Sequence, residues 1–287
     1  MEAFFRSVLV IARYEVRRAL ARKKVLAGVL LIVASQILGV YAYSEILRTV
    51  RTVRTAGLPM APEPSLAWIF SYFLPSYFLS GLAALIASGS FSEEFEKGHS
   101  ELLFTKPVTR LEIFLGKLLG GYGLQAFFVV LFLILSLIAS SIAFGPQSEV
   151  GLAPEILVAN IYSNMVFFSI AMALSIITKN TLISSTVPLA LLLFLPFISG
   201  ILIFLERSTG ASYSLLVRLL PTWGSLLQAY IIPAEILQKA FIVSPLVLAL
   251  YGYGDPLGAA ISVAGYSILF FSISLLKILY EDIPRRS

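Results

Sequence analysis

Few residues of this chain could carry out catalysis, and their types and spacing exclude the common catalytic sites. The chain has one His and no Cys, which excludes a multi-histidine metal site and a thiolate nucleophile within a single chain. A G-x-S-x-G nucleophile motif is absent. The nearest approach to a phosphate-binding loop is Gly116-Lys117, but Leu111 stands where the first Gly is needed and Leu118 where the Ser or Thr is needed. We therefore expect no enzymatic activity in this chain, with no catalytic residue, no bound metal and no bound cofactor.

One charged segment, residues 91–117, has a detailed pattern, FSEEFEKGHSELLFTKPVTRLEIFLGK. Pro107 cannot continue a helix, and Thr109-x-x-Glu112 is a capping box that opens the next helix. Three acids lie near the start of a first short helix, where the positive end of the helix dipole favours them: Glu93, Glu94 and Glu96. The segment is either an ordinary loop that re-enters the membrane or a docking element for a cytosolic protein.

Composition places the whole chain in a membrane. Residues of the hydrophobic set make up 58% of the 287 residues, charged residues make up 13%, and the mean hydropathy is +0.91. A soluble domain carries roughly 25% charged residues. The sequence therefore predicts an all-α polytopic membrane protein, with residues 1–287 forming a single transmembrane domain.

Six uncharged runs reach the roughly 20 residues that a helix needs to cross a bilayer. They are 25–44, 64–92, 118–148, 156–178, 180–205 and 256–276. None contains Asp, Glu, Lys, Arg or His, which weighs against a proton-coupled pump because such pumps place ionisable groups of these kinds within the membrane. In the third helix, Gly116-x-x-x-Gly120 is a small-residue spacing that permits close contact between helices.

Residues 206–256 separate the fifth span from the sixth. Their two uncharged runs, 219–234 and 240–254, are short for spanning and are interrupted by prolines. We expect a proline-broken outer segment that dips into the membrane or lies at its surface. An eight-span alternative stays open, and it would leave the orientation of the last helix unchanged.

The distribution of basic residues predicts the orientation. With the N-terminus inside, the cytoplasmic segments hold fifteen of the 21 Lys and Arg residues, as the positive-inside rule requires. We therefore expect a multi-pass protein of the cell membrane with both termini in the cytoplasm. The net charge of +5 is then a signal of topology, and we expect no nucleic-acid partner. The arginine-rich stretch 48–55 is expected to extend the first span as a short helix.

Residues 1–24 read as an amphipathic helix at the cytoplasmic face of the membrane. At 100° per residue, one face is apolar: Phe4, Phe5, Val8, Ala12, Val16 and Ala19. The opposite face carries Arg6, Arg13 and Arg17. Two interpretations stay open, a simple basic anchor in the lipid bilayer and an elbow helix that packs beside the spans.

The stretch EKGHSELLFTKPVTRLEIFLGKLLG (96–120) resembles a segment of the permease subunits of ABC transporters of the type-2 (ABC-2) export class. That segment is written approximately E-[KR]-G-T-x-E-x-L-L-x-x-P-[VL]-[ST]-R-x-E-I-x-x-G-K. His99 stands where the family often has Thr. Residues 14–31 look like the same family's elbow helix and first span. The matching residues are Glu96, Lys97, Gly98, Glu101, Leu102, Leu103, Pro107, Val108, Thr109, Arg110, Glu112, Ile113, Gly116 and Lys117.

The resemblance implies a coupling helix within residues 92–112 that docks on a separate ATP-binding subunit. Glu93 to Phe104 would form the docking surface, with Glu94, Glu96 and Glu101 as polar contacts, and Arg110 and Glu112 would fix the second helix against the first or against the ATPase. It also implies two ATP-binding subunits that hold ATP and Mg, and a second permease chain, identical or a sister. The function implied is ATP-driven export or mechanotransmission. The rival interpretations are an ATPase-independent transporter or channel, and a membrane scaffold.

Overall fold

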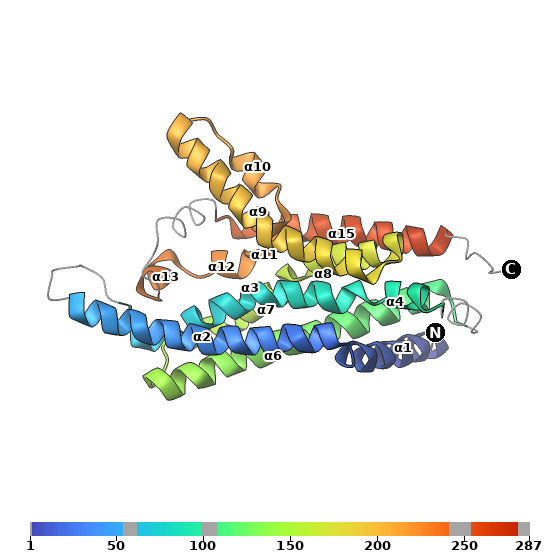
Figure 1. Cartoon of the computed structure of the whole chain (residues 1–287), viewed down its shortest axis with the longest axis horizontal. Helices are drawn as coiled ribbons and strands as arrows, with labels where there is room; N and C mark the ends of the chain where they lie inside the picture. Colours follow the sequence, from blue (N-terminus) through green and yellow to red (C-terminus); the bar gives the residue numbers. More distant parts are fainter. Residues whose placement is uncertain (1, 54–61, 99–107, 241–253, 281–287) are drawn as a thin grey trace.

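The computed structural model describes residues 2–53, 62–98, 108–240 and 254–280 (Figure 1), and within these ranges the chain is helical with no strand. Six helical stretches are long and apolar enough to cross a membrane. They are Val25–Thr49, Pro64–Glu96, Arg110–Phe144, Val150–Thr178, Thr181–Thr209 and Pro256–Tyr280. The predicted all-α fold with six spans is confirmed.

The spans are built from seven long helices, because the fourth span consists of two. These are α2 (Lys23–Val53), α3 (Ala67–Ser88), α6 (Arg110–Phe144), α7 (Ala153–Ser163), α8 (Met165–Thr178), α9 (Thr181–Thr209) and α15 (Pro256–Tyr280). The second and fourth spans form the centre of the bundle, because 71% and 67% of their most apolar windows are buried, against 33% or less in the others. The arginine-rich extension of the first span is helical as far as Val53, and residues 54 and 55 lie outside the described residues.

The interior of the bundle holds a group of polar, uncharged side chains around Asn164, where α7 ends and α8 begins. Ser80 of α3 donates a hydrogen bond to Asn164 Oδ1 (2.6 Å), and Asn164 Nδ2 donates to Asn160 Oδ1 (2.8 Å). Ser163 donates to Gln228 Oε1 at 3.0 Å. Buried polar groups in lipid must find partners within the protein, and these contacts supply most of them, although Asn160 Nδ2 has no hydrogen-bond partner among the described residues.

Short helices follow α9 in place of a further span. They are α10 (Ser214–Arg218), α11 (Pro221–Ser225), α12 (Leu227–Tyr230) and α13 (Ala234–Ala240). Trp223 and Gln228, from α11 and α12, are buried, and these helices contact α7 and α15. Among the residues described between α9 and α15, no helix is long enough to span a membrane. Residues 241–253 of the predicted outer segment lie outside the described residues.

The remaining helices, α1 (Glu2–Leu20) and α4 (Ser92–Glu96), lie with the start of α6 and the end of α15 at one end of the bundle (Figure 1). We call it the charged end. On α1, Val8 and Ala19 are buried, as the helical wheel predicts. Phe5, which the wheel places on the same apolar face, is instead 58% exposed, because it lies at the edge of the face that α6 covers.

Helix α1 packs on α6 through the predicted pair of glycines. A Cβ atom on Gly116 would lie 2.6 Å from Cβ of Ile11, and one on Gly120 would lie 2.9 Å from Cα of Ala12. Real side chains do not approach this closely, so only glycine permits the contact. The small-residue spacing is therefore confirmed as a helix contact, and its partner is the N-terminal helix.

We predict that Gly120→Ala destabilises the protein by about 1–3 kcal/mol, the usual effect of overpacking, because the added methyl group meets the backbone of α1. The measurement is thermal unfolding in mild detergent. The matched control is Gly123→Ala on the same helix, where an added Cβ meets no atom within 4 Å. Equal unfolding temperatures for the two variants would contradict the assigned contact.

Candidate functional site

The predicted coupling segment, residues 92–112, is described at both of its ends. Its first part is α4, which is followed by Gly98 with a positive φ of 69°, a backbone conformation that glycine adopts without strain. Its last part opens α6. Residues 99–107 lie outside the described residues, so the docking roles of five residues stay predictions: Glu101, Leu102, Leu103, Phe104 and Pro107.

The predicted capping box is present at the start of α6. The backbone N–H of Thr109 donates to Glu112 Oε2 (2.6 Å), and the N–H of Glu112 donates to Thr109 Oγ1 (3.2 Å). Glu112 is buried. Its carboxylate therefore serves the N-terminus of its own helix, as the capping box predicts. The role that the resemblance implies for Glu112, fixing this helix against the first or against the ATPase, stays a prediction.

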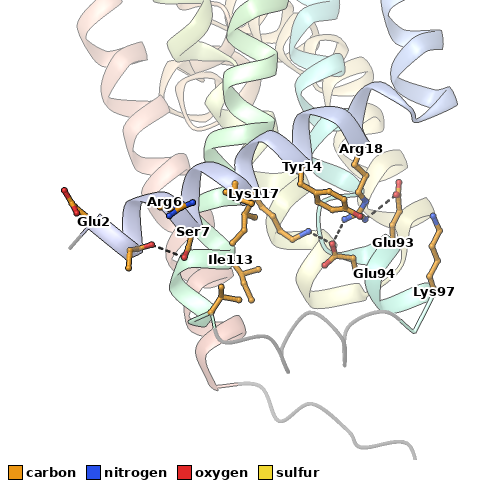
Figure 2. A pocket seen from close by; sticks show the side chains of 14 residues that line it. Glu2, Arg6, Ser7, Tyr14, Arg18, Glu93, Glu94, Lys97, Ile113 and Lys117 are labelled. Carbon is orange, nitrogen blue, oxygen red and sulfur yellow. Dashed lines mark hydrogen bonds and ion pairs between the residues drawn. The ribbon is translucent and has the colours of Figure 1, made fainter.

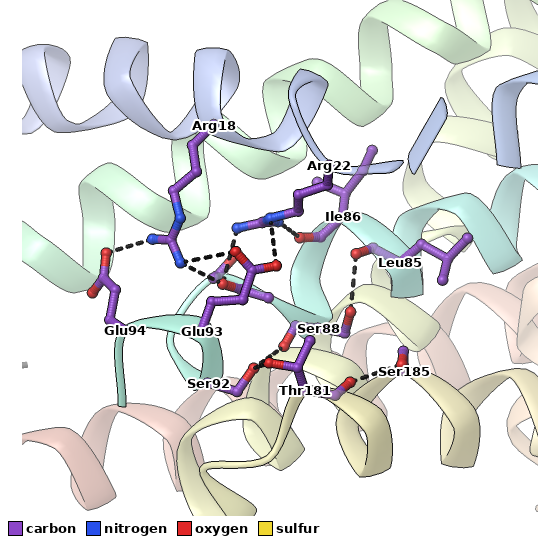
Figure 3. A network of polar contacts seen from close by, with 12 residues as sticks. Arg18, Arg22, Leu85, Ile86, Ser88, Ser92, Glu93, Glu94, Thr181 and Ser185 are labelled. Atoms are coloured by element: carbon purple, nitrogen blue, oxygen red, sulfur yellow. Dashed lines mark hydrogen bonds and ion pairs between the residues drawn. The ribbon is translucent and has the colours of Figure 1, made fainter. Parts of the chain in front are cut away.

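Six charged side chains meet between α1, α4 and α6 (Figure 3 shows four of them). We call this group the ion cluster: Glu15, Arg18, Arg22, Glu93, Glu94 and Lys117. Lys117 Nζ lies 2.7 Å from Glu94 Oε1 and 3.5 Å from Glu15 Oε2, and Arg18 also pairs with Glu94 Oε1. The cluster thus joins three helices that are far apart in the sequence.

The arginines of the ion cluster also bind the end of α3. Arg22 Nη1 donates to the carbonyl of Ile86 (2.7 Å), and both arginines donate to the carbonyl of Gly89 at 2.9 Å. The last carbonyls of a helix have no partner within the helix and carry partial negative charge. Gly89 has no room for a side chain, because a Cβ would lie 2.9 Å from Arg22 Cζ. The two guanidinium groups therefore cap α3 where it turns into α4.

Burial and neutrality define the electrostatics of this site. Glu15 is fully buried and Lys117 is 1% exposed, and three acids balance three bases. Burial acts to raise the pKa of Glu15, but Lys117, Arg22 and Arg18 outweigh it and hold that pKa below its usual range. Burial acts to lower the pKa of Arg18, and Glu15, Glu94 and Glu93 raise it instead. The cluster therefore favours the charged forms of Glu15 and Arg18.

The opposite side of α4 is bonded to the start of α9. Glu96 accepts hydrogen bonds from the backbone N–H of Thr181 (2.6 Å) and from its hydroxyl (2.7 Å). The hydroxyls of Ser92 and Thr181 lie 2.9 Å apart (Figure 3), and Ser184 donates to the carbonyl of Ser88 at 2.9 Å. Helix α4 is therefore held between the ion cluster on one side and α9 on the other.

Arg110 ties the end of the coupling segment to the last span. Its Nη1 donates to the carbonyls of Ile278 (3.0 Å) and Leu279 (2.8 Å), in the last turn of α15. This is the same kind of helix C-terminal contact that Arg22 makes on α3. The structure therefore places Arg110 against the chain's own sixth span.

The predicted site residues fall into two groups. Lys97, Gly98 and the three arginines of the elbow helix, Arg6, Arg13 and Arg17, are exposed. Glu93, Glu94, Glu96, Arg110 and Glu112 instead make contacts within the chain. The prediction of polar contacts to another subunit did not foresee that Glu94 is buried and already paired.

Sequence reasoning missed half of the ion cluster and the role of a fourth member. Glu15, Arg18 and Arg22 were not singled out, and Lys117 was noted only as part of motifs. The signal for Glu15 was present, because at 100° per residue it falls between Val8 and Ile11 on the packed face of α1, where an isolated acid is costly. No feature of the sequence names its partner, since Lys117 lies 102 residues further along the chain.

The sequence was compared with models of known protein families and with curated proteins. A family model described as "ABC-2 family transporter protein" matches residues 9–258. The chain belongs to this family. The match includes most of α1, all of the coupling segment and five of the six spans, so this ABC-2 transporter protein is a multi-pass membrane permease. A search of curated proteins gave no match.

We predict that Lys117→Met lowers the free energy of unfolding by about 3–5 kcal/mol, because removing one partner of a buried ion pair leaves the other charge uncompensated. Unfolding in detergent, followed by circular dichroism, measures the effect. Lys23→Met is the matched control, since Lys23 is exposed and surface substitutions usually change stability by less than about 0.5 kcal/mol. A Lys117→Met protein as stable as the control would show that the ion cluster is not a stabilising contact.

Acidification should weaken the ion cluster. Because the pKa of Glu15 is lower in the folded protein than in the unfolded chain, its contribution is present near pH 7 and is lost as the pH falls through the folded value. We expect the unfolding temperature of the wild type to fall more steeply than that of Glu15→Gln as the pH is lowered from about 5 to about 2, because this range runs from the ordinary carboxyl value to values below it. Parallel curves for the two proteins would contradict the assigned pKa shift.

Proposed function

We propose that this ABC-2 permease couples ATP hydrolysis by a separate ATP-binding subunit to export or mechanotransmission across the cell membrane. The observation that carries the proposal is the position of α4. This short helix ends the second span, and its polar side chains bind α1 and α6 through the ion cluster and α9 through Thr181. A displacement of α4 would therefore act on several helices at once.

The stiffness of these connections suits the transmission of movement. Breaking a buried ion pair costs several kcal/mol, so a load on α4 moves α1 and the start of α6 before it separates them. In α9, Pro188 and Pro196 lie inside the helix and are natural kink sites. The part of α9 bound to α4 can therefore tilt relative to the rest of the helix.

The proposed assembly follows the family resemblance. Two ATP-binding subunits would bind ATP and Mg²⁺, and a second permease, identical or a sister chain, would complete the membrane unit. The charged end would face the cytoplasm, since it carries most of the Lys and Arg residues. The uncharged, partly polar interior suits a lipid-like, peptide-like or hydrophobic cargo.

Affinity co-purification in mild detergent from cells that express the native partners tests this function. We expect a Walker-type ATPase to accompany the wild type, and its yield to fall at least tenfold with Glu101→Lys/Leu103→Asp. These positions lie in the predicted docking surface and outside the ion cluster. Charge reversal at Glu94 is a poorer test, because it would place a third cation beside Arg18 and Lys117.

The matched control is Glu155→Lys, which reverses the charge of an exposed acid in the first turn of α7, outside the coupling segment. It should retain the ATPase. Wild-type protein that is folded, with its partners expressed, and that nevertheless brings down no ATPase would overturn the proposal.

A further inference from the structure

A groove of about 1090 Å³ opens between α1, α4 and the start of α6 (Figure 2). Val10, Tyr14 and Ile113 give it apolar walls, and Glu94 lies at its inner side. In Figure 2 most of the span bundle lies above α1, whereas the ends of α6 and α15 continue below it, on the same side as Ile113 and Glu94. The groove therefore opens away from most of the span bundle and toward the side on which a soluble subunit would bind.

The inner side of the groove holds an unsatisfied acceptor. Glu94 Oε1 is paired with Arg18 and Lys117, but the buried Oε2 atom has no hydrogen-bond partner among the described residues. A buried acceptor without a donor costs about 1–3 kcal/mol. The terminal torsion of a glutamate is soft, so a small rotation presents this carboxylate to a donor that enters the groove.

The rim of the groove carries charges that the ion cluster does not use. Arg6 and Lys97 line it from opposite sides, on α1 and just after α4. Both are exposed, and the described part of the chain gives neither a hydrogen-bond nor an ion-pair partner. Among the described residues that line the groove, Glu2 is the only acid outside the neutral ion cluster. The rim is therefore net positive.

We propose that this groove receives an acidic segment of the ATP-binding subunit. Carboxylates of that segment pair with Arg6 and Lys97 at the rim, and its apolar side chains cover Val10 and Tyr14. A hydrogen-bond donor at its tip binds the unpaired Oε2 atom of Glu94. The inference rests on the proposed function and adds to it, because α4 then contributes one wall of a receiving site as well as a projecting helix. A complementary charge pattern of this kind fixes register and accelerates association.

Site-specific photocrosslinking in the purified complex tests the occupant. A benzoylphenylalanine at Val10, which is 62% exposed, faces the groove, and one at Leu9, which is 65% exposed, lies outside it. We expect Val10 to crosslink to an Asp- or Glu-containing peptide of the ATPase, identified by mass spectrometry, and Leu9 not to do so. Crosslinks from Val10 to lipid, or to residues 99–107 of the same chain, would overturn the proposal.

Affinity measurements with the purified ATP-binding subunit test the charges. Arg6→Glu/Lys97→Glu should weaken binding at least tenfold at low salt, and less at high salt because screening removes the contribution. Arg13→Glu/Arg17→Glu makes the same change of net charge on exposed residues outside this groove and should leave the affinity within twofold. Thermal unfolding of both variants checks that they remain folded.

The outcomes separate the two proposals. If the ATPase binds the wild type and both double variants equally, the groove is not its docking site, whereas the proposed function stands. If the wild type binds no ATPase, the proposed function fails first.

Discussion

Charge neutrality within a buried volume is the constraint on which the charged end depends. Glu15 and Lys117 lie in the protein interior, where neither could remain ionised alone. Each becomes tolerable because α1, α4 and α6 bring the opposite charges within hydrogen-bonding distance. The dependence runs both ways, because the three helices can pack in this arrangement only if the charges that they bury balance. The glycine contact between α1 and α6 then fixes the distance over which they do so.

Stiff and flexible connections alternate along the chain. At the charged end, ion pairs and carbonyl caps hold α1, α3, α4 and α6 as one unit. Further into the bundle, the two prolines of α9 interrupt the regular backbone hydrogen bonding of the fifth span, because proline has no N–H to donate. A displacement of α4 would thus move the helices of the charged end together, and it would bend α9 further into the bundle. This combination of stiff and flexible parts suits a transporter better than a rigid scaffold.

Sequence reasoning succeeded where a local signal determines the structure. Uncharged runs predicted the six spans, Thr109 and Glu112 predicted the capping box, and Gly116 and Gly120 predicted a close helix contact. It could not identify the partner in that contact, nor the ion cluster, because both depend on pairing between distant segments. Acids at a helix start look the same whether they face solvent or, like Glu94, an interior lysine. The outer segment 206–256 was predicted only as proline-broken, and its packing on α7 and α15 likewise required the folded bundle.

The length of chain between the two halves of the ion cluster sets the order of events during synthesis. Glu15 and Lys117 are 102 residues apart, so at a translation rate of about 5–20 residues per second the lysine follows the glutamate by roughly 5–20 s. During that interval α1 has neither its glycine-lined partner surface nor Lys117, and the membrane surface is an apolar phase available to its exposed Phe5 and Leu9. The apolar face of the N-terminal helix is therefore useful already during synthesis, because it lets α1 bind the membrane surface before the transporter has folded. We expect α1 to lie at the bilayer surface until the third span is made and packs against it.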